Sequence, residues 1–221
     1  MNVLIIGASR GIGQELVKQH LAAGDKVTAT VRSEEAHAQL AQQGAKPLWL
    51  DVADMASCSG LAWQIDGEAF DTAWFVAGVY GPRSTGLQPP TEAEFDHVMH
   101  TNVLAAMRLL PAVADTLAPN AKIAVISSRM ASIGLRANPS GWLYRASKAA
   151  LNSVQKDASI ALQGRATCVT LHPGWVQTDM GGAGADITVE HSVQTMRDTV
   201  AALTPEDSGR FLNHDGQPLA W

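Results

Sequence analysis

Three glycines near the start of the chain, Gly7, Gly11 and Gly13, constrain its fold more than any other feature. They directly follow residues 3–6, a continuous aliphatic run that is typical of a strand buried on both faces. Apolar residues at helical spacing come next and continue until Gly24. A strand, a glycine-rich loop and a helix in this order form the first unit of a parallel α/β sheet. The amino terminus therefore predicts parallel strands joined by helices.

Strand and helix patterns alternate along the rest of the chain. The predicted strands are residues 3–6, 26–31, 47–50, 72–76, 122–127 and 167–172, with a short seventh strand near 210–212. The predicted helices are residues 12–21, 34–43, 55–64, 91–116, 143–162 and 189–203. Because parallel strands need crossovers, this alternation predicts a Rossmann-type doubly wound α/β sheet of about seven parallel strands, with helices on both faces. No linker or repeat divides the chain, so we expect one domain over residues 1–221.

Composition and charge exclude several classes of protein. Apolar residues make up 46% of the 221 residues and charged residues 17%, which favours a large core over disorder. The net charge of −5, without a basic run, argues against nucleic-acid binding. No apolar run is long enough to cross a bilayer, and the first residues lack the cationic leader of a signal peptide. The two cysteines and seven histidines lack metal-ligand spacing, so we expect reduced thiols, no metal site and a cytoplasmic location.

The glycine loop has the chemistry of a phosphate-binding turn. Gly7 permits a tight turn, Gly11 lets backbone amides approach a phosphate, and Gly13 allows the helix to pack closely on the strand. Because the amino end of a helix attracts anions, the loop predicts a bound dinucleotide. Its spacing, G-x-x-x-G-x-G, differs from the commoner G-x-G-x-x-G. A purely structural turn is the alternative, since glycine also ends strands for local reasons.

The end of the second predicted strand indicates which dinucleotide binds. An NAD-binding unit usually carries an acid there that holds the ribose 2′-hydroxyl, but this chain has Arg32. A guanidinium binds the 2′-phosphate that a carboxylate would repel, and Arg10 in the glycine loop offers a second positive charge. We therefore predict NADP(H), with NAD less favoured. An ordinary solvated cation is the alternative interpretation of Arg32.

Tyr144 and Lys148 stand four residues apart in a predicted helix and so share one of its faces. A free phenol, with a pKa of about 10, is a poor acid or base at neutral pH. A nearby ammonium and a positively charged nicotinamide stabilise the phenolate and lower that pKa. Ser127 and Ser128 follow the fifth predicted strand at the edge where open α/β sheets bind ligands. Taken singly, each pair is also explained as an ordinary helix surface or strand end.

Together these features make the whole chain resemble the single-domain short-chain dehydrogenase/reductase family, and most closely its branch of C-factor-like proteins and small carbonyl reductases. Sixteen residues separate Ser128 from Tyr144, where many members have about thirteen, and the loop 136–141 can absorb the difference. Ser127 and Ser132 are weaker alternatives for the catalytic serine. The resemblance implies a catalytic tetrad of Asn102, Ser128, Tyr144 and Lys148.

The resemblance also implies which residues bind the cofactor. They are Gly7, Ser9, Arg10, Gly11, Ile12, Gly13, Arg32, Asp51, Val52, Ala77, Gly78, Tyr144, Lys148, Pro173, Gly174, Val176 and Thr178. The family's two asparagines after the fourth strand are replaced here by Phe75 and Val76. Any polar stabilisation that those asparagines give the sheet must come from other residues.

The implied activity is reversible hydride transfer between NADP(H) and a carbonyl compound. The resemblance implies that Ser128 binds the reacting oxygen and that Tyr144 is the general acid/base. It also implies that Lys148 holds the nicotinamide ribose and lowers the pKa of Tyr144, and that Asn102 anchors a water molecule of a proton relay.

The resemblance leaves the substrate and the biological role open. If the apolar side chains that flank the predicted cleft also line it, they favour an apolar aldehyde or ketone as substrate. These side chains are Tyr80, Met130, Trp142, Trp175 and Met180. The glycine-rich residues 181–185 are expected to form a substrate lid. An NADP(H)-binding regulatory or signalling protein of the C-factor type, with little turnover, is the alternative function. The family also suggests a homodimer or homotetramer.

Overall fold

The computed structural model describes residues 1–221 and contains one seven-stranded sheet, in which each strand runs parallel to its neighbours in the order β3-β2-β1-β4-β5-β6-β7. The strands are β1 Asn2–Ile6, β2 Lys26–Val31, β3 Lys46–Trp49, β4 Phe70–Phe75, β5 Leu117–Ile126, β6 Ala166–His172 and β7 Phe211–Asn213. The main helices are α1 Gly11–Ala22, α2 Glu34–Gln42, α3 Met55–Gln64, α4 Glu92–Met99, α5 Ala105–Ala114, α6 Trp142–Ala161 and α7 Val189–Ala202. The predicted Rossmann-type fold of seven parallel strands is confirmed.

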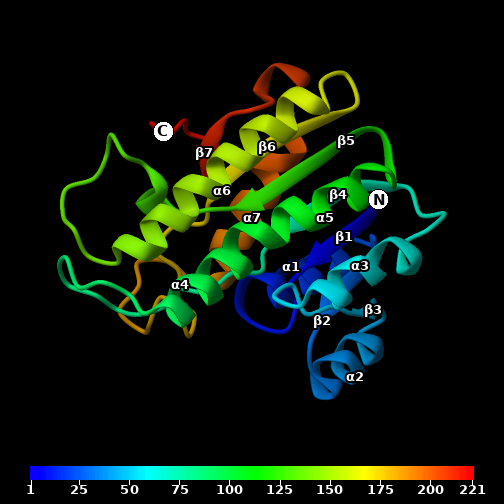
Figure 1. Cartoon of the computed structure of the whole chain (residues 1–221). Coiled ribbons are helices and arrows are strands. Elements are labelled where there is room, and N and C mark those ends of the chain that lie inside the picture. Colours follow the sequence, from blue (N-terminus) through cyan, green and yellow to red (C-terminus); the bar gives the residue numbers. More distant parts are fainter.

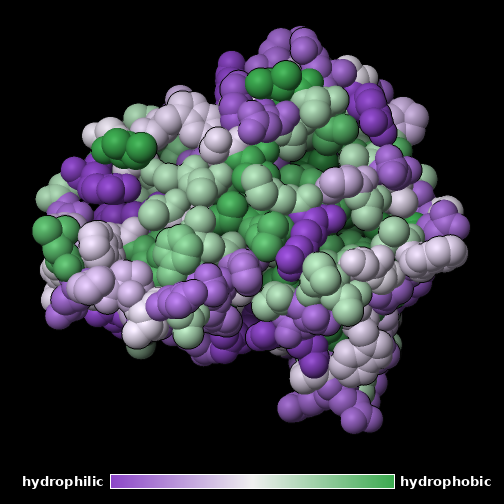
Figure 2. Space-filling view, viewed as in Figure 1, coloured by the Kyte–Doolittle hydropathy of each residue, from purple (hydrophilic) through white to green (hydrophobic).

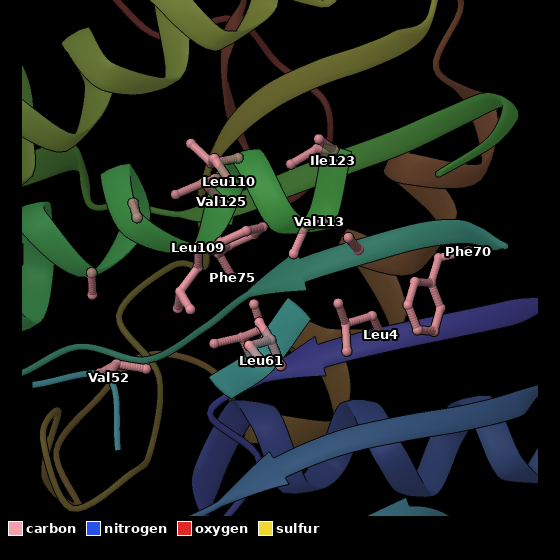
Figure 3. Close-up of a cluster of buried hydrophobic side chains, with 14 of the residues drawn as sticks. Leu4, Val52, Leu61, Phe70, Phe75, Leu109, Leu110, Val113, Ile123 and Val125 are labelled. Atoms are coloured by element: carbon pink, nitrogen blue, oxygen red, sulfur yellow. The ribbon is translucent and has the colours of Figure 1, made fainter. Parts of the chain in front are cut away.

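Two helix layers enclose the sheet because successive strand residues point to opposite faces. In β1, Val3 and Ile5 pack toward α1, α2 and α7, whereas Leu4 and Ile6 pack toward α3, α5 and α6. Figure 3 shows the second of these cores, with Leu4 of β1 below the side chains of α5. Burial on both faces explains the uninterrupted aliphatic sequence of β1.

The helix layer of α3, α5 and α6 lies in front in Figures 1 and 2. Hydrophobic residues gather near the centre of this face and hydrophilic residues lie mostly toward its rim (Figure 2). No helix combines the length and the apolar character that a membrane crossing requires.

The long helical region that the sequence predicts over residues 91–116 contains a π-helical turn. α4 begins with a capping box between Thr91 and Glu94, and a π-helical turn at His100–Leu104 separates α4 from α5. Pro111 lies inside α5 without ending it. The chain is helical without a gap from residue 92 to residue 114, so the predicted helical region is confirmed, although apolar spacing does not reveal the π-turn within it. Such turns often occur at functional sites, and this one contains Asn102.

The carboxyl ends of the strands form one edge of the molecule, on the left in Figure 1. The chain moves outward from β1 to β2 and β3, and then returns to β4 on the other side of β1. In open α/β sheets, ligands bind in the crevice at such a reversal. The loops 76–91, 127–141 and 173–188 follow β4, β5 and β6 and extend from this edge (Figure 1). They carry many of the predicted site residues.

Candidate active site

The glycine loop after β1 is packed too closely to hold side chains at two of its three glycines. A Cβ atom on Gly7, which has a φ of +94°, would lie 2.7 Å from the Ala77 nitrogen. A Cβ atom on Gly13 would lie 2.0 Å from the Gly7 carbonyl oxygen. The Gly7 amide donates a hydrogen bond to Thr30 Oγ1 at 2.9 Å. Thr30 on β2 thus fixes the start of the loop, a role that sequence reasoning missed because the contact depends on strand pairing.

The glycine loop faces segments that lie far away in the sequence. A Cβ atom on Gly11 would lie 3.4 Å from Thr178 Cγ2, so the loop approaches the segment after β6. Gly78 follows β4, and a Cβ atom there would lie 3.2 Å from Asn102 Oδ1 and 3.3 Å from Lys148 Nζ. The structure therefore brings predicted cofactor residues and predicted catalytic residues to the same edge of the sheet.

Arg32 and Arg10, the predicted 2′-phosphate ligands, lie at the surface and face carboxylates. Arg32 Nη1 is 3.9 Å from Asp51 Oδ1, and Arg10 Nη1 is 3.0 Å from Asp179 Oδ2. Exposed ion pairs of this kind contribute little free energy, so an incoming phosphate can compete for the guanidiniums. Val52, another predicted cofactor residue, has its side chain in the core (Figure 3), which leaves only its backbone available.

Tyr144 lies in the first turn of α6, and its phenol is buried. Its ring stacks on that of Tyr80, with centroids 4.6 Å apart and planes 21° apart. Burial raises the pKa of Tyr144 to about 12, although the Ser128 hydroxyl acts in the opposite direction. The phenol is therefore protonated at neutral pH and has Ser128 as a close neighbour.

Lys148 is buried one turn along α6, and its Nζ donates to the Ile126 carbonyl oxygen at 2.9 Å. The ammonium lies 5.9 Å from the centroid of the Tyr144 ring, and burial lowers the pKa of Lys148 to about 8. The sequence-based expectation that Lys148 lowers the pKa of Tyr144 is not met by the chain's own groups. Desolvation dominates the pKa of both side chains, and a charge count from sequence does not include desolvation.

The three candidate serines have different partners. Ser127 is buried and donates to Asn152 Oδ1 on α6 at 2.6 Å. Ser132 donates to the Trp221 carbonyl oxygen at 3.2 Å. Ser128 accepts a hydrogen bond from the Met130 amide and is the serine whose hydroxyl influences Tyr144. The geometry therefore favours Ser128 over the two alternatives.

Asn102 is held by the π-turn in a position where its amide group bonds two other elements. Its Oδ1 accepts from the Val79 amide at 2.8 Å, and its Nδ2 donates to the Val79 carbonyl oxygen at 2.8 Å. Nδ2 also donates to Ser147 Oγ at 2.9 Å, and Ser147 Oγ donates to the Tyr144 carbonyl oxygen. Asn102 thus fixes the backbone after β4 to the first turns of α6. No sequence signal pointed to Val79 or Ser147.

The segment after β6 folds against both the sheet and itself. Ser192 Oγ on α7 donates to the Pro173 carbonyl oxygen at 2.6 Å, and Gly174 has a φ of +87°. Trp175 Nε1 donates to the Gly181 carbonyl oxygen at 2.9 Å, and Val176 forms a parallel bridge with Ile187. These hydrogen bonds fix the loop that contains four of the predicted cofactor residues, Pro173, Gly174, Val176 and Thr178. The predicted lid residues 181–185 extend from it.

Comparison with known proteins agrees with this geometry. The family model described as short chain dehydrogenase matches residues 1–187. The 1-hydroxy-2-glutathionyl-2-methyl-3-butene dehydrogenase of Rhodococcus sp. is 31% identical over 229 residues, covering 99% of each chain. The C-signal protein of Myxococcus xanthus is 36% identical over 132 residues, covering 58% of this chain and 80% of its own.

A solved structure extends the likeness to three dimensions. The NADPH-bound carbonyl reductase from chicken fatty liver has a TM-score of 0.87 and 32% sequence identity, covering 100% of this chain and 98% of its own. The fold and the matched residues lead to one family. The chain belongs to the short-chain dehydrogenase family of oxidoreductases.

Proposed function

We propose that the protein interconverts a carbonyl compound, an aldehyde or ketone, and the corresponding alcohol, with NADP(H) as cofactor. The observation that carries this proposal is the buried Tyr144 phenol, which has Ser128 and Lys148 beside it at the edge that also holds the glycine loop. These side chains come from two segments of the chain, since Ser128 follows β5 and both Tyr144 and Lys148 lie in α6. A proton donor with an orienting hydroxyl and a cation beside it is suited to proton transfer to a carbonyl oxygen.

The residues present fit a dinucleotide. Gly7 and Gly13 leave no room for a Cβ atom, and Gly78 keeps the space in front of Asn102 and Lys148 free of a side chain. The exposed guanidiniums of Arg10 and Arg32 support a 2′-phosphate, and hence NADP(H) over NAD(H). The solved carbonyl reductase of chicken binds NADPH. When bound, the cofactor supplies or accepts the hydride.

The protein's own groups then handle the proton. Ser128 donates a hydrogen bond to the substrate oxygen, and Tyr144 donates its phenolic proton to that oxygen as the alcohol forms. A phenol pKa of about 12 keeps this proton in place at neutral pH, which suits the reducing direction. Lys148, with a pKa of about 8, is mostly protonated at pH 7 and stabilises the phenolate that forms. Asn102 positions α6, which carries both groups.

A spectroscopic assay tests this function. The purified protein is mixed with NADPH and a panel of aldehydes and ketones, and oxidation is followed at the NADPH absorption band. We expect turnover of at least one carbonyl, with NADPH used in preference to NADH. If NADPH binds but no carbonyl is reduced and no alcohol is oxidised with NADP, the proposed activity is refuted.

A second candidate function is a signalling protein that binds NADP(H) and has little turnover. The likeness to the C-signal protein of Myxococcus xanthus favours it. The two candidates differ in what they need from Tyr144. A signalling protein would keep its biological effect in a Tyr144→Phe variant, whereas an enzyme would lose its effect together with its turnover.

A further inference from the structure

Positive charge gathers in the loops after β4 and β5, at the edge of the sheet where Tyr144 lies, although the chain as a whole has a net charge of −5. Residues 72–91 and 116–156 contain no Asp or Glu. These segments include the loops after β4 and β5 and most of α6. The loop after β6 adds the acids Asp179 and Asp186, of which Asp179 is already paired with Arg10. The cations of the two acid-free segments are Arg83, Lys122, Arg129, Arg136, Arg145, Lys148 and Lys156.

The arginines of these two segments form no ion pair with a carboxylate of the protein. Arg10 and Arg32, on the cofactor side, each face an aspartate. Unpaired guanidiniums near one another produce a local positive potential that attracts anions. The loops after β4 and β5 therefore differ from the glycine loop and the end of β2 in having arginines without carboxylate partners.

Arg83 lies over the ring of Tyr80, which in turn stacks on Tyr144. Its guanidinium carbon lies 5.1 Å from the centroid of the Tyr80 ring, and the Tyr80 and Tyr144 centroids are 4.6 Å apart. The guanidinium is thus no more than about 10 Å from the Tyr144 ring. One Nη2 hydrogen bond, to the Met180 carbonyl oxygen at 3.0 Å, holds Arg83 against the loop after β6. The rest of this exposed guanidinium is free to bind a ligand.

Arg145 adds positive charge near the same stack, and Arg136 acts on Arg145. Arg145 is buried and fixed by bonds from Nε to the Ser140 carbonyl oxygen and from Nη2 to Asn138 Oδ1. Burial lowers the pKa of Arg145, the charge of Arg136 acts in the same direction, and the Tyr80 phenol acts in the opposite direction. Arg145 directly follows Tyr144 in α6, so its guanidinium adds positive charge close to the stack.

We propose that the carbonyl substrate carries a carboxylate, and that Arg83 binds this carboxylate at the mouth of the cleft. The reacting carbonyl lies at Tyr144, the apolar body of the substrate passes the Tyr80 ring, and Arg136 and Arg145 strengthen the positive potential. Arg83 is then a residue that determines specificity rather than one that takes part in proton transfer. The inference rests on the oxidoreductase function proposed above and names its substrate class.

A matched substrate pair tests the inference. 4-Carboxybenzaldehyde and methyl 4-formylbenzoate share the aldehyde and the ring but differ in charge. With NADPH, we expect the wild type to show a kcat/KM at least about tenfold higher for the carboxylate at low ionic strength, with the preference shrinking in salt. Arg83→Met should lower kcat/KM about tenfold for the carboxylate and change it less than about twofold for the ester. Arg83→Lys should retain part of the preference.

Arg165→Met is the matched control. Arg165 is also exposed, lacks a carboxylate partner and donates from Nη2 to a backbone oxygen, that of Ala114, but it lies just before β6, at the opposite edge of the sheet. We expect this variant to keep the wild-type preference. Benzoate and its neutral isostere benzamide, tested as inhibitors of the best aldehyde of the panel, provide a second measurement. Benzoate should inhibit at least about tenfold more strongly, and Arg83→Met should abolish the difference.

Two results would overturn the proposal. One is an equal kcat/KM for the acid and the ester together with equal inhibition by benzoate and benzamide. The other is an Arg83→Met variant that loses activity equally on charged and neutral compounds, which would give Arg83 a structural role. Absence of any carbonyl turnover with bound NADPH is a different result: it refutes the proposed oxidoreductase function, and the substrate inference with it.

Discussion

Ser127 and Ser128 are adjacent in sequence, but their contacts give Ser127 a role in stability and Ser128 a role in catalysis. Replacing each serine by alanine tests the two roles separately. Ser127 is buried and donates a 2.6 Å hydrogen bond to Asn152 Oδ1, joining the end of β5 to α6. Ser128 lies beside the Tyr144 phenol and accepts only the Met130 amide. We therefore predict that Ser127→Ala lowers stability and Ser128→Ala lowers activity.

The size of each effect follows from the contacts. Ser127→Ala leaves the buried Asn152 oxygen without this donor, which costs about 1–3 kcal/mol because water does not replace the lost partner. In a chain of this length about 2 kcal/mol lowers Tm by roughly 4–8 °C. Ser128→Ala removes only a partner of the Met130 amide at a short turn, a cost of about 1 kcal/mol or less. Loss of one donor to the reacting oxygen lowers kcat about 100-fold.

Urea denaturation and steady-state reduction of the best carbonyl measure the two effects in the same preparations. We expect Ser127→Ala to retain at least about a third of the wild-type kcat while losing stability. Ser128→Ala should unfold near the wild-type midpoint. A Ser127→Ala variant that is as stable as the wild type but has lost its turnover would show that the two roles are reversed.

Three further predictions concern the cofactor and the buried lysine. Arg32→Met should raise the Kd for NADPH at least about tenfold and that for NADH less than about threefold, measured by fluorescence titration; equal losses would refute the 2′-phosphate contact. Gly13→Ala would place a Cβ atom 2.0 Å from the Gly7 oxygen and should weaken NADPH binding more than tenfold, whereas Gly60→Ala in α3, with its nearest neighbour at 3.9 Å, should bind normally. Burial lowers the pKa of Lys148 to about 8, so between pH 8 and the unfolded value of about 10.4 the unfolded chain holds more protons, and stability rises with pH. Urea denaturation at pH 8 and 9.5 should show the wild type gaining stability relative to Lys148→Met, and a parallel response would contradict this pKa.

Local patterns predicted the framework of the fold. The aliphatic run 3–6, the glycines and the helical spacing after them all agree with β1, its loop and α1, because each signal acts within a few residues. Non-local pairing was harder to foresee. β5 begins at Leu117, five residues before the predicted start, although Asn120 has a φ of +60°. Its register with β4 shifts between Phe70 and Thr72, and only the neighbouring strand makes this extension favourable.

The candidate site was predictable as a set of residues but not as a set of contacts. Motif order pointed to Ser128, Tyr144 and Lys148, and the structure brings them together. The environment of each group depends on burial, which is why the expected fall in the Tyr144 pKa becomes a rise. The stacking of Tyr80 on Tyr144 joins the loop after β4 to the first turn of α6, which are far apart in the chain, and no local pattern encodes that contact.

The proposed activity depends on proton transfer from the Tyr144 phenol to a substrate oxygen. A single-turnover experiment with Tyr144→Phe, which keeps the ring and its stack on Tyr80 but removes the hydroxyl, tests it most directly. With NADPH bound in advance at near wild-type affinity, we predict that carbonyl reduction slows at least about 1000-fold. Reduction by the variant at the wild-type rate would contradict this role of the phenol.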